Sequence, residues 1–536
     1  MAHGKLRLLL AIGAVLLFGR VISAQPPLPI IGYLKGDNQN DRLGTSLAGP
    51  GDVNGDGYAD LLAAEFGTKR VKLFYGNFGR IDSIPDMVWN GYISVKTIGD
   101  INGDGKPEVV MGTDTANQLR IFWGGNLLDT LPDFALDFSD TTCVGGKGIQ
   151  DISAGDLNGD GYGDLVVSTI FTCGGPIFQL GRVQVFWGGT LLDTFPDWTR
   201  TVRFQPSPYR SQFGVSSKVV QNLNGDAFAD LIVTQIGNEG AGTTGCLHFF
   251  LGGNPMDTLA AQILGPPPPV QVESFVDWGT KVIPLNDLNQ DGKTDFWVGG
   301  AGSLLRLYYG NFPLDSMPAS VLDQDGDQPA PGGDFNQDGF TDLILGQPRA
   351  SFLAGSVFIY VGSVNMNGNY DIAIHDYDLQ GYVAEVFGLA VTNTGDMNGD
   401  GVDDFAASAK TSVDPFDHGE VFFFSGDSSI PTSVKEGKSN LPRFFELFQN
   451  TPNPFQQSTE IGFQLKPTIR QESVRLVVFN LLGQRIKTLV NEKAKAGERK
   501  VLWDGRDEDG NWMPSGIYFY KLSYGGETQV KKMVFL

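Results

Sequence analysis

The chain has 536 residues, of which 71 are glycine and 11% are aromatic, and its formal net charge is -22. This length allows more than one domain and a large core, while the acidic balance argues against nucleic acid or an anionic membrane surface as a partner. Abundant glycine and aromatic residues, without a sustained apolar period of 3.6, indicate many short strands joined by turns.

The first 24 residues have the pattern of a secretory signal peptide. Two basic residues precede the apolar run Leu8–Gly19, and Ala24 offers a small residue for cleavage. A membrane-anchoring helix needs about 20 apolar residues, and Arg20 ends this run earlier. Cleavage leaves no cysteine at the new N-terminus, so a lipid anchor is not expected either. We predict an exported chain that begins near Gln25 and has no transmembrane segment when mature.

An acidic segment at residues 51–60 predicts a calcium loop that leads into a strand. Asp52, Asn54 and Asp56 stand at alternate positions, which we number one, three and five, and such oxygens converge on one hard cation. Tyr58 would offer its backbone carbonyl from position seven, and Asp60 its carboxylate from position nine. The glycine at position six supplies the sharp turn, because glycine takes up the required backbone angle easily.

Six further copies of this segment follow, so the chain contains a repeat of roughly 50 to 65 residues. We expect up to seven calcium ions, bound to structural loops and not to an active site. The ligands predicted from positions one, three, five, seven and nine of copies one to seven are Asp52, Asn54, Asp56, Tyr58, Asp60; Asp100, Asn102, Asp104, Lys106, Glu108; Asp156, Asn158, Asp160, Tyr162, Asp164; Asn222, Asn224, Asp226, Phe228, Asp230; Asp287, Asn289, Asp291, Lys293, Asp295; Asp334, Asn336, Asp338, Phe340, Asp342; and Asp396, Asn398, Asp400, Val402, Asp404.

The fourth copy departs from the others. Asn222 replaces the first aspartate, and Ala227 replaces the glycine at position six. The loop therefore has one carboxylate fewer and carries a Cβ where a positive φ is expected. We predict that this site binds calcium most weakly.

Other readings of the loops are less consistent with the spacing. An EF-hand needs a bidentate glutamate at position twelve, and the dockerin type has the same requirement. The residues found there are apolar: Ala63, Met111, Val167, Val233, Val298, Leu345 and Ala407. Asp-Gly turns without metal would not explain the repeated carboxylate at position nine.

Each loop is followed by a short apolar run and then by an aromatic strand ending in glycine, such as Leu73–Gly76. Several copies continue with a turn such as 193–197, Asp-Thr-Phe-Pro-Asp, and leave room for one more strand. Seven units of four antiparallel strands predict an all-β fold, a seven-bladed β-propeller over residues 25–426. The seventh unit lacks its last strand, and we predict that Ile30–Leu34 supplies it as the outer strand.

Residues 30–426 resemble the FG-GAP repeats of the integrin α-subunit propeller and of many bacterial exported proteins. The residues that give the family its name are partly present, as Phe213-Gly214 and Phe387-Gly388, with Trp278-Gly279 and Leu43-Gly44 as variants. The resemblance implies calcium sites at one rim of the propeller and recognition by loops on the other face.

The sequence gives little indication of catalysis. Neither a Gly-x-Ser-x-Gly nor a His-Glu-x-x-His motif is present, and the mature chain has three isolated histidines. We predict no catalytic residue, no organic cofactor and no enzyme activity. Among the cysteines, Cys143 and Cys173 can form a disulfide in an oxidising compartment, which leaves Cys246 alone; three free thiols are the alternative.

After a predicted linker at 427–445 the composition changes, because residues 443–536 include 14 basic residues and 10 acidic ones. Alternating strands such as Val474–Phe479 predict a small immunoglobulin-like β-sandwich at 446–536. Five segments resemble the C-terminal sorting domain of the type IX secretion system: 450–455, 478–484, 503–507, 515–520 and 531–536. That resemblance implies a Gram-negative bacterium, export through the periplasm, and the outer-membrane secretion machinery as a partner. A structural module like that of the flagellar hook cap is the alternative.

Two functions remain open. The first is a noncatalytic adhesion or ligand-binding protein, secreted or at the cell surface, whose variable loops such as 168–181 and 237–245 recognise a protein or glycan ligand. The second is a secreted carbohydrate-active protein, either a lectin or a glycoside hydrolase or lyase that uses carboxylates.

Overall fold

The computed structural model describes residues 28–79, 81–113, 117–125, 128–138, 146–173, 178–190, 192–204, 212–236, 245–267, 278–300, 304–325, 327–348, 355–364, 366, 368–375, 379, 386–410, 417–430, 445–465, 473–480, 485–493, 497–508, 510–524 and 527–536. The chain divides into two compact units, residues 1–433 and 434–536. The boundary falls inside the stretch predicted as a linker. The predicted signal peptide lies outside the described residues.

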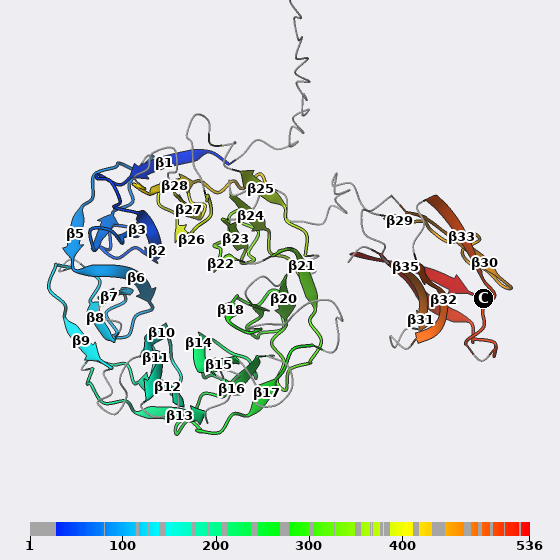
Figure 1. Ribbon diagram of the computed structural model, residues 1–536, viewed down its shortest axis with the longest axis horizontal. Helices are drawn as coiled ribbons and strands as arrows, with labels where there is room; N and C mark the ends of the chain where they lie inside the picture. The colour runs from blue at the N-terminus through cyan, green and yellow to red at the C-terminus, as the bar shows by residue number, and fades with distance from the viewer. Residues whose placement is uncertain are drawn as a thin grey trace, which may run out of the picture. The chain divides into compact units, whose positions relative to one another are not determined.

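The first unit contains seven four-stranded antiparallel sheets among its described residues, which Figure 1 shows disposed around a common centre. The four antiparallel strands expected for each repeat are thus observed. In order of pairing, the sheets are β2 (Leu43–Gly51), β3 (Asp60–Glu65), β4 (Arg70–Phe74), β5 (Met87–Asn90); β6 (Tyr92–Ile98), β7 (Glu108–Thr113), β8 (Gln118–Phe122), β9 (Phe134–Asp137); β10 (Gly146–Gly155), β11 (Asp164–Cys173), β12 (Phe178–Phe186), β13 (Trp198–Phe204); β14 (Gln212–Val220), β15 (Asp230–Ile236), β16 (Cys246–Phe250), β17 (Gln262–Leu264); β18 (Lys281–Pro284), β19 (Phe296–Gly299), β20 (Leu304–Tyr308), β21 (Ser320–Asp325); β22 (Gln328–Pro331), β23 (Leu343–Gln347), β24 (Ser356–Tyr360), β25 (Ile372–His375); and β26 (Val391–Gly395), β27 (Asp404–Ala409), β28 (Glu420–Phe424), β1 (Ile30–Lys35).

The sheet that contains both ends of the first unit is completed by the N-terminal strand. β1 pairs antiparallel with β28, with Tyr33 opposite Phe422 and Lys35 opposite Glu420. The Tyr33 hydroxyl also donates to a Glu420 carboxylate oxygen at 2.7 Å. The strand predicted to complete the seventh unit therefore takes the expected outer place.

The apolar core of this unit lies between neighbouring sheets. Val109, Met111 and Phe122 of the second sheet pack with Leu62 and Trp89 of the first in one buried cluster. A sheet covered on both faces needs apolar side chains at consecutive positions and not at alternate ones. All six residues of β3 and all six of β27 are accordingly buried. A further cluster joins the sheet that contains β1 and β28 to the sheet β2–β5, through side chains such as Leu34 and Leu61.

The second unit consists of two antiparallel sheets around one apolar core, in agreement with the β-sandwich expected for it. Trp503, Tyr520 and Phe535 are among its buried residues. The strands are β29 (Phe445–Leu447), β30 (Thr459–Leu465) and β33 (Gly497–Trp503) in one sheet, and β32 (Arg485–Lys493), β31 (Ser473–Asn480), β34 (Gly516–Tyr524) and β35 (Glu527–Phe535) in the other. Within the described residues, no helix is long and apolar enough to cross a membrane.

Candidate metal centres in the seven acidic loops

All seven acidic loops occupy the same place, where each joins the strand at one edge of its sheet to the strand that pairs with it, as from β2 to β3 or from β26 to β27. The first loop, for example, joins β2 to β3, and its position nine is the first residue of β3. Figure 1 shows the strands that precede the loops, such as β2, β6 and β10, on the inner side of the ring. The repeat therefore places all seven predicted sites equivalently.

The carboxylate at position nine is fully buried in every copy, where Asp60, Glu108, Asp164, Asp230, Asp295, Asp342 and Asp404 each have 0% exposure. One of its oxygens accepts a hydrogen bond from the position-two amide of its own loop. The donors are Val53 (2.8 Å), Ile101 (2.8 Å), Leu157 (2.7 Å), Leu223 (2.7 Å), Leu288 (2.8 Å), Phe335 (2.8 Å) and Met397 (3.0 Å).

In six loops the other oxygen accepts from the glycine that ends the aromatic strand. These donors are Gly76 (3.0 Å), Gly188 (2.9 Å), Gly252 (3.0 Å), Gly310 (2.8 Å), Gly362 (2.7 Å) and Gly426 (3.2 Å). The sequence suggested only a metal ligand at position nine. In the structure this carboxylate also joins the loop to the third strand of its sheet. Glycine recurs at the end of that strand because a Cβ there would lie 2.0 to 2.5 Å from the backbone carbonyl at position eight of the loop.

The side chains at positions one, three and five fold over the loop backbone. In the first loop the Asp52 carboxylate accepts from the amides of Gly55 (2.5 Å) and Gly57 (2.8 Å). Asn54 Oδ1 accepts from the Asp56 amide at 2.8 Å, and Asp56 Oδ1 accepts from the Tyr58 amide at 2.9 Å. These bonds hold the predicted ligand oxygens at one exposed loop. None of these hydrogen bonds involves the backbone carbonyl at position seven, so that carbonyl stays a predicted ligand.

Burial disfavours the charged form of the position-nine carboxylates and raises their pKa values. The backbone amide bonds oppose this effect, whereas the carboxylate at position five adds to it. The pKa is raised to about 7 for Asp60, 8 for Glu108, 7 for Asp164, 6 for Asp230, 6 for Asp295, 8 for Asp342 and 7 for Asp404. A nearby cation would favour the ionised carboxylates and reverse these shifts.

The second loop fits a cation best on its own geometry. Asp100, Asp104 and Glu108 each offer a carboxylate oxygen within 4.8 Å of the other two. Glu108 Oε1 is buried and has no hydrogen-bond partner. A buried, unpaired carboxylate oxygen is costly, and oxygen ligands of this kind are those that calcium prefers. The residues of this loop therefore fit a hard divalent cation.

The fourth loop differs from the other copies in its backbone as well as its ligands. Glycine at position six has a positive φ elsewhere, such as 96° at Gly57 and 91° at Gly161, but Ala227 does not. The expectation of a strained Cβ at Ala227 is therefore wrong, because the loop changes conformation there instead. Asn222 Oδ1 still accepts a hydrogen bond from the Gly225 backbone amide (2.7 Å), and Asn222 Nδ2 donates to the carbonyl of Gly292 in the fifth loop at 3.2 Å.

Five turns each carry one exposed apolar side chain. They lie between the third and fourth strands of the first five sheets. We call these the apolar turn residues: Ile84, Leu131, Phe195, Leu259 and Met317, which are 73, 72, 76, 65 and 56% exposed. In each turn the residue's amide donates to an aspartate two positions earlier, at 2.6 to 3.0 Å. Sequence reasoning found this turn motif but did not identify its middle residue as a surface feature.

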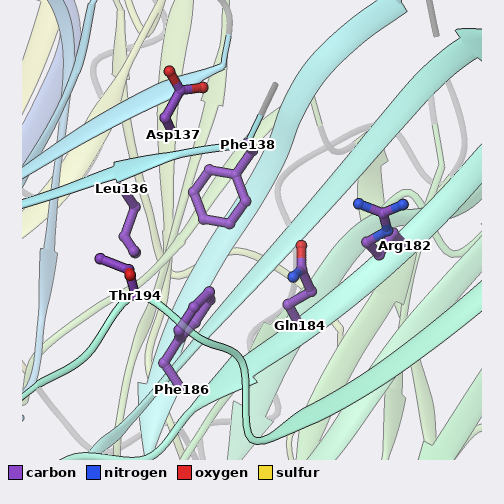
Figure 2. Close-up of a pocket in the computed structure, with 7 residues that line it drawn as sticks. All are labelled: Leu136, Asp137, Phe138, Arg182, Gln184, Phe186 and Thr194. Atoms are coloured by element: carbon purple, nitrogen blue, oxygen red, sulfur yellow. The ribbon is translucent and has the colours of Figure 1, made fainter. Parts of the chain in front are cut away.

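The described part of the first unit has at least two pockets. One of about 440 Å³ lies among the second, third and fourth loops and includes Asp100, Asp156 and Ala227 in its lining. The other, of about 120 Å³, is bordered by Phe138, Gln184 and Phe186 (Figure 2). Asp137 is the one carboxylate among the described residues that line this smaller pocket.

The histidines and cysteines have local partners. His375 Nδ1 lies 2.8 Å from Ser356 Oγ, and His418 Nδ1 lies 3.2 Å from the Gly36 carbonyl. Cys246 is a free thiol 3.6 Å from His248 Nε2. Cys143 lies outside the described residues, as does the Cys173 side chain, so the disulfide between them stays a prediction.

Fold and loops together define an all-β protein of repeated four-stranded sheets, each with an acidic loop at one equivalent place. Residues 100–167 match the FG-GAP-like repeat family, and residues 326–361 match the FG-GAP repeat family. Residues 449–527 match the FlgD Ig-like domain. The chain thus carries FG-GAP repeats in its first unit and an immunoglobulin-like segment in its second.

Integrin α-subunits are among the curated relatives. Integrin alpha-6 of Gallus gallus is 33% identical over 121 residues, which make up 21% of this chain and 10% of the integrin. Integrin alpha-7 of Homo sapiens is 36% identical over 115 residues, 20% of this chain and 9% of the integrin. The chain therefore spans about a tenth of the length of these relatives.

A solved structure of PorZ, a surface component of the type IX secretion system of Porphyromonas gingivalis, aligns over 93% of this chain and 59% of PorZ. The sequence identity is 14% and the TM-score is 0.35, which is too low to support an argument on fold or function.

Proposed function

We propose that the chain is an exported calcium-binding protein that binds a ligand without catalysing a reaction. Its first unit would be a closed, seven-bladed propeller, and its loops would use calcium to hold the blades. The observation that carries this proposal is the buried carboxylate at position nine. In six sheets it joins the acidic loop to the aromatic strand through the same hydrogen bond.

In each loop the residues at positions one, three, five and nine would supply side-chain oxygens, and position seven its carbonyl. Calcium, when bound, would neutralise carboxylates that otherwise repel one another around a buried acid. A cation that binds only the folded state stabilises that state by mass action. The loops would therefore act as structural fasteners, with the fourth the weakest.

Ring closure would depend on β1, which supplies the outer strand of the last sheet and the buried Leu34. Removing residues 25–36 would expose the edge of β28 and unpair its backbone groups. The melting temperature should fall by more than about 5 °C relative to the intact chain, given the size of effects that lost burial and pairing produce. An unchanged melting temperature would contradict the closed ring.

The apolar turn residues support a binding function. One such side chain is exposed in each of the first five sheets, and a hydrogen bond to the turn aspartate fixes its backbone amide. A partner that covered several of them would bury apolar surface, which favours association. The loops 168–181 and 237–245, predicted to recognise a ligand, would offer a second recognition surface, of which the described residues cover only part.

The place of action we propose is the cell surface or the medium of a Gram-negative bacterium, reached through the periplasm. The second unit would act as a sorting domain for the outer-membrane secretion machinery, as its resemblance to type IX sorting domains suggests. The match to the FlgD Ig-like domain keeps the structural alternative open. Deleting residues 446–536 should leave the first unit in the periplasm, whereas normal surface display of that variant would reject the sorting role.

A carbohydrate-active protein is the second candidate, because carboxylates are abundant on the loops. A glycan array, a protein array and a hydrolysis screen of the exported chain separate the two. Binding without product release is the expected result, and release of soluble sugars would establish the enzyme instead. Leu131→Ser with Phe195→Ser should weaken binding at least about fivefold if the apolar turn residues take part, while Thr130→Ala with Thr194→Ala serves as a matched control.

A further inference from the structure

At four of the seven junctions between neighbouring loops, a backbone hydrogen bond joins two of the loops that are predicted to bind calcium. The position-eight amide of one loop donates to the position-one carbonyl of the loop before it. These bonds run from Ala59 to Asp396 (3.0 Å), Gly163 to Asp100 (3.0 Å), Ala229 to Asp156 (2.9 Å) and Thr294 to Asn222 (2.6 Å).

The donor in this bond belongs to the peptide that is predicted to bind the cation. The carbonyl of position seven and the amide of position eight are opposite ends of one planar peptide unit. A cation that fixes the carbonyl therefore also fixes the direction of the N–H toward the preceding loop. Donation by the N–H further polarises the carbonyl at the other end, which strengthens its interaction with a cation.

The acceptor also belongs to a predicted ligand residue. Asp396, which accepts from Ala59, is position one of the seventh loop, and its side chain accepts from the amides of Gly399 (2.7 Å) and Gly401 (2.8 Å). Anchoring the Asp396 carbonyl restrains the backbone that carries this side chain. The ordering of one loop thus lowers the entropy that its neighbour loses on binding.

Side chains strengthen the same junctions. The ring at position seven of one loop lies on the glycine at position four of the loop before it. A Cβ built on Gly399 would lie 2.5 Å from Tyr58, one on Gly103 would lie 2.4 Å from Tyr162, and one on Gly159 would lie 2.5 Å from Phe228. The first, third and fourth loops therefore each pack directly on the loop before them.

The junction between the first and second loops lacks the N–H group that donates this hydrogen bond at the other junctions described above. Position eight of the second loop is Pro107, which has no N–H. Other contacts persist there, since the Gly125 amide donates to the Val53 carbonyl at 2.6 Å and Lys106 Nζ lies near Gly55. This junction therefore lacks the peptide hydrogen bond of the junctions on either side of it, and a lysine side chain takes the place of the aromatic ring.

We infer that calcium binding at adjacent loops is coupled through the position-eight peptide, and that Pro107 interrupts this coupling between the first and second loops. The inference rests on the proposed calcium role of the loops. Binding would then be cooperative along the series of linked loops. The coupling is reciprocal, so a lesion in one loop weakens its linked neighbour on either side.

One variant of the full chain tests the inference, because the first loop has a linked neighbour and an unlinked one. Asp56→Asn weakens the first loop, and calcium-dependent hydrogen exchange is then followed by mass spectrometry in segments 396–404 and 100–108. We expect the calcium midpoint of protection to rise about fivefold in 396–404 and to change less than about twofold in 100–108. Segment 100–108 serves as the internal control, because it belongs to the loop on the other side of the altered one.

A second variant restores the missing donor. Pro107→Ala in the Asp56→Asn chain, compared with Pro107→Ala alone, should make the midpoint in 100–108 sensitive to the first loop. Equal shifts in the two segments, or no shift in either while the loops still bind calcium, would overturn the coupling alone. If calcium protects none of the seven loops in the unaltered chain, the proposed calcium role fails and the coupling with it.

Discussion

The second and fourth loops occupy equivalent places in their sheets, but their predicted ligand side chains make different contacts. The second loop brings three carboxylates together and leaves Glu108 Oε1 buried without a partner. In the fourth loop both oxygens of Asp230 accept backbone amides, at 2.7 and 3.0 Å, and Asn222 donates to the fifth loop. The two bonds to Asp230 recur at position nine of five other loops, so what distinguishes the fourth loop is Asn222, an amide that donates to its neighbour in place of a ligand carboxylate. The second loop is thus arranged for a cation, while the fourth has exchanged one carboxylate for a hydrogen bond between loops.

Calcium removal is expected to change the stability of the first unit more than any single substitution, and it tests whether any of the loops is stabilised by calcium. Each occupied loop adds about 2.7 kcal/mol when free calcium is 100 times its dissociation constant. Chelation should therefore lower the melting temperature of the first unit by more than about 10 °C. Scanning calorimetry with calcium and with chelator measures the shift. A melting temperature indifferent to chelator would remove the structural role from all loops, the second included.

Matched amide substitutions at position nine should separate the two loops most clearly. Asp230→Asn replaces an acceptor oxygen by an NH₂ group facing a backbone amide, so it should cost about 1 to 3 kcal/mol with or without calcium. Glu108→Gln can keep the bond from Ile101 while its NH₂ group replaces the unpaired Oε1. It should destabilise the chain in calcium but be neutral or stabilising in chelator.

Chemical denaturation of both variants in both conditions gives the four values needed. The same calcium dependence for Asp230→Asn as for Glu108→Gln would mean that the two loops do not differ in the way their hydrogen bonds indicate.

Giving the fourth loop the residues of the other copies should strengthen it. Asn222→Asp with Ala227→Gly adds a carboxylate and permits the positive φ seen at Gly161. We expect calcium affinity at this loop to rise about tenfold, equivalent to about 1.4 kcal/mol. In calcium-free buffer the same variant should lose about 1 kcal/mol of stability, because the bond from Asn222 to the Gly292 carbonyl disappears.

The reverse exchange in the third loop, Asp156→Asn with Gly161→Ala, is the matched control and should weaken binding there. Site-resolved hydrogen exchange against calcium concentration reports both changes. An unaltered fourth site would show that ligand charge and loop conformation do not set its affinity.

The smallest effect concerns His248 in the fourth sheet. Burial, assisted by the charge of Arg200, lowers its pKa to about 4 from 6.5. The folded state therefore takes up this proton less readily than the unfolded state. The associated stability is complete above pH 6.5 and is lost as the pH falls toward 4. Because the ring is partly exposed, we expect only about 1 kcal/mol.

Denaturant midpoints of the unaltered chain and of His248→Gln, measured with chelator between pH 7 and 4.5, test this. The difference between the two chains should change by that amount across the window. Parallel pH curves would show that His248 contributes nothing to acid sensitivity.

Much of the architecture follows from the repeat itself. Loop, apolar run and aromatic strand recur with fixed spacing, and such local patterns determine which residues form strands and which form turns. The missing strand in the seventh unit was evident for the same reason, because an incomplete unit beside an unpaired strand such as Ile30–Leu34 indicates where that strand belongs. The sequence likewise marked the fourth loop as different.

The remaining features depend on contacts between residues far apart in the chain. The bond from Gly76 to Asp60 joins residues 16 positions apart. The bond from Ala59 to Asp396 spans almost the whole first unit. The spacing of the sequence motifs carries no information on either bond. The same is true of the unpaired Glu108 oxygen, since its side chain is one methylene longer than aspartate and only packing decides where that oxygen lies. By itself, the sequence determined the repeated acidic loop, its predicted ligands and its place before a strand, because these are local. The tertiary structure decided how each loop is joined to its own sheet and to the next loop, because backbone hydrogen bonds between sheets exist only once the sheets are packed.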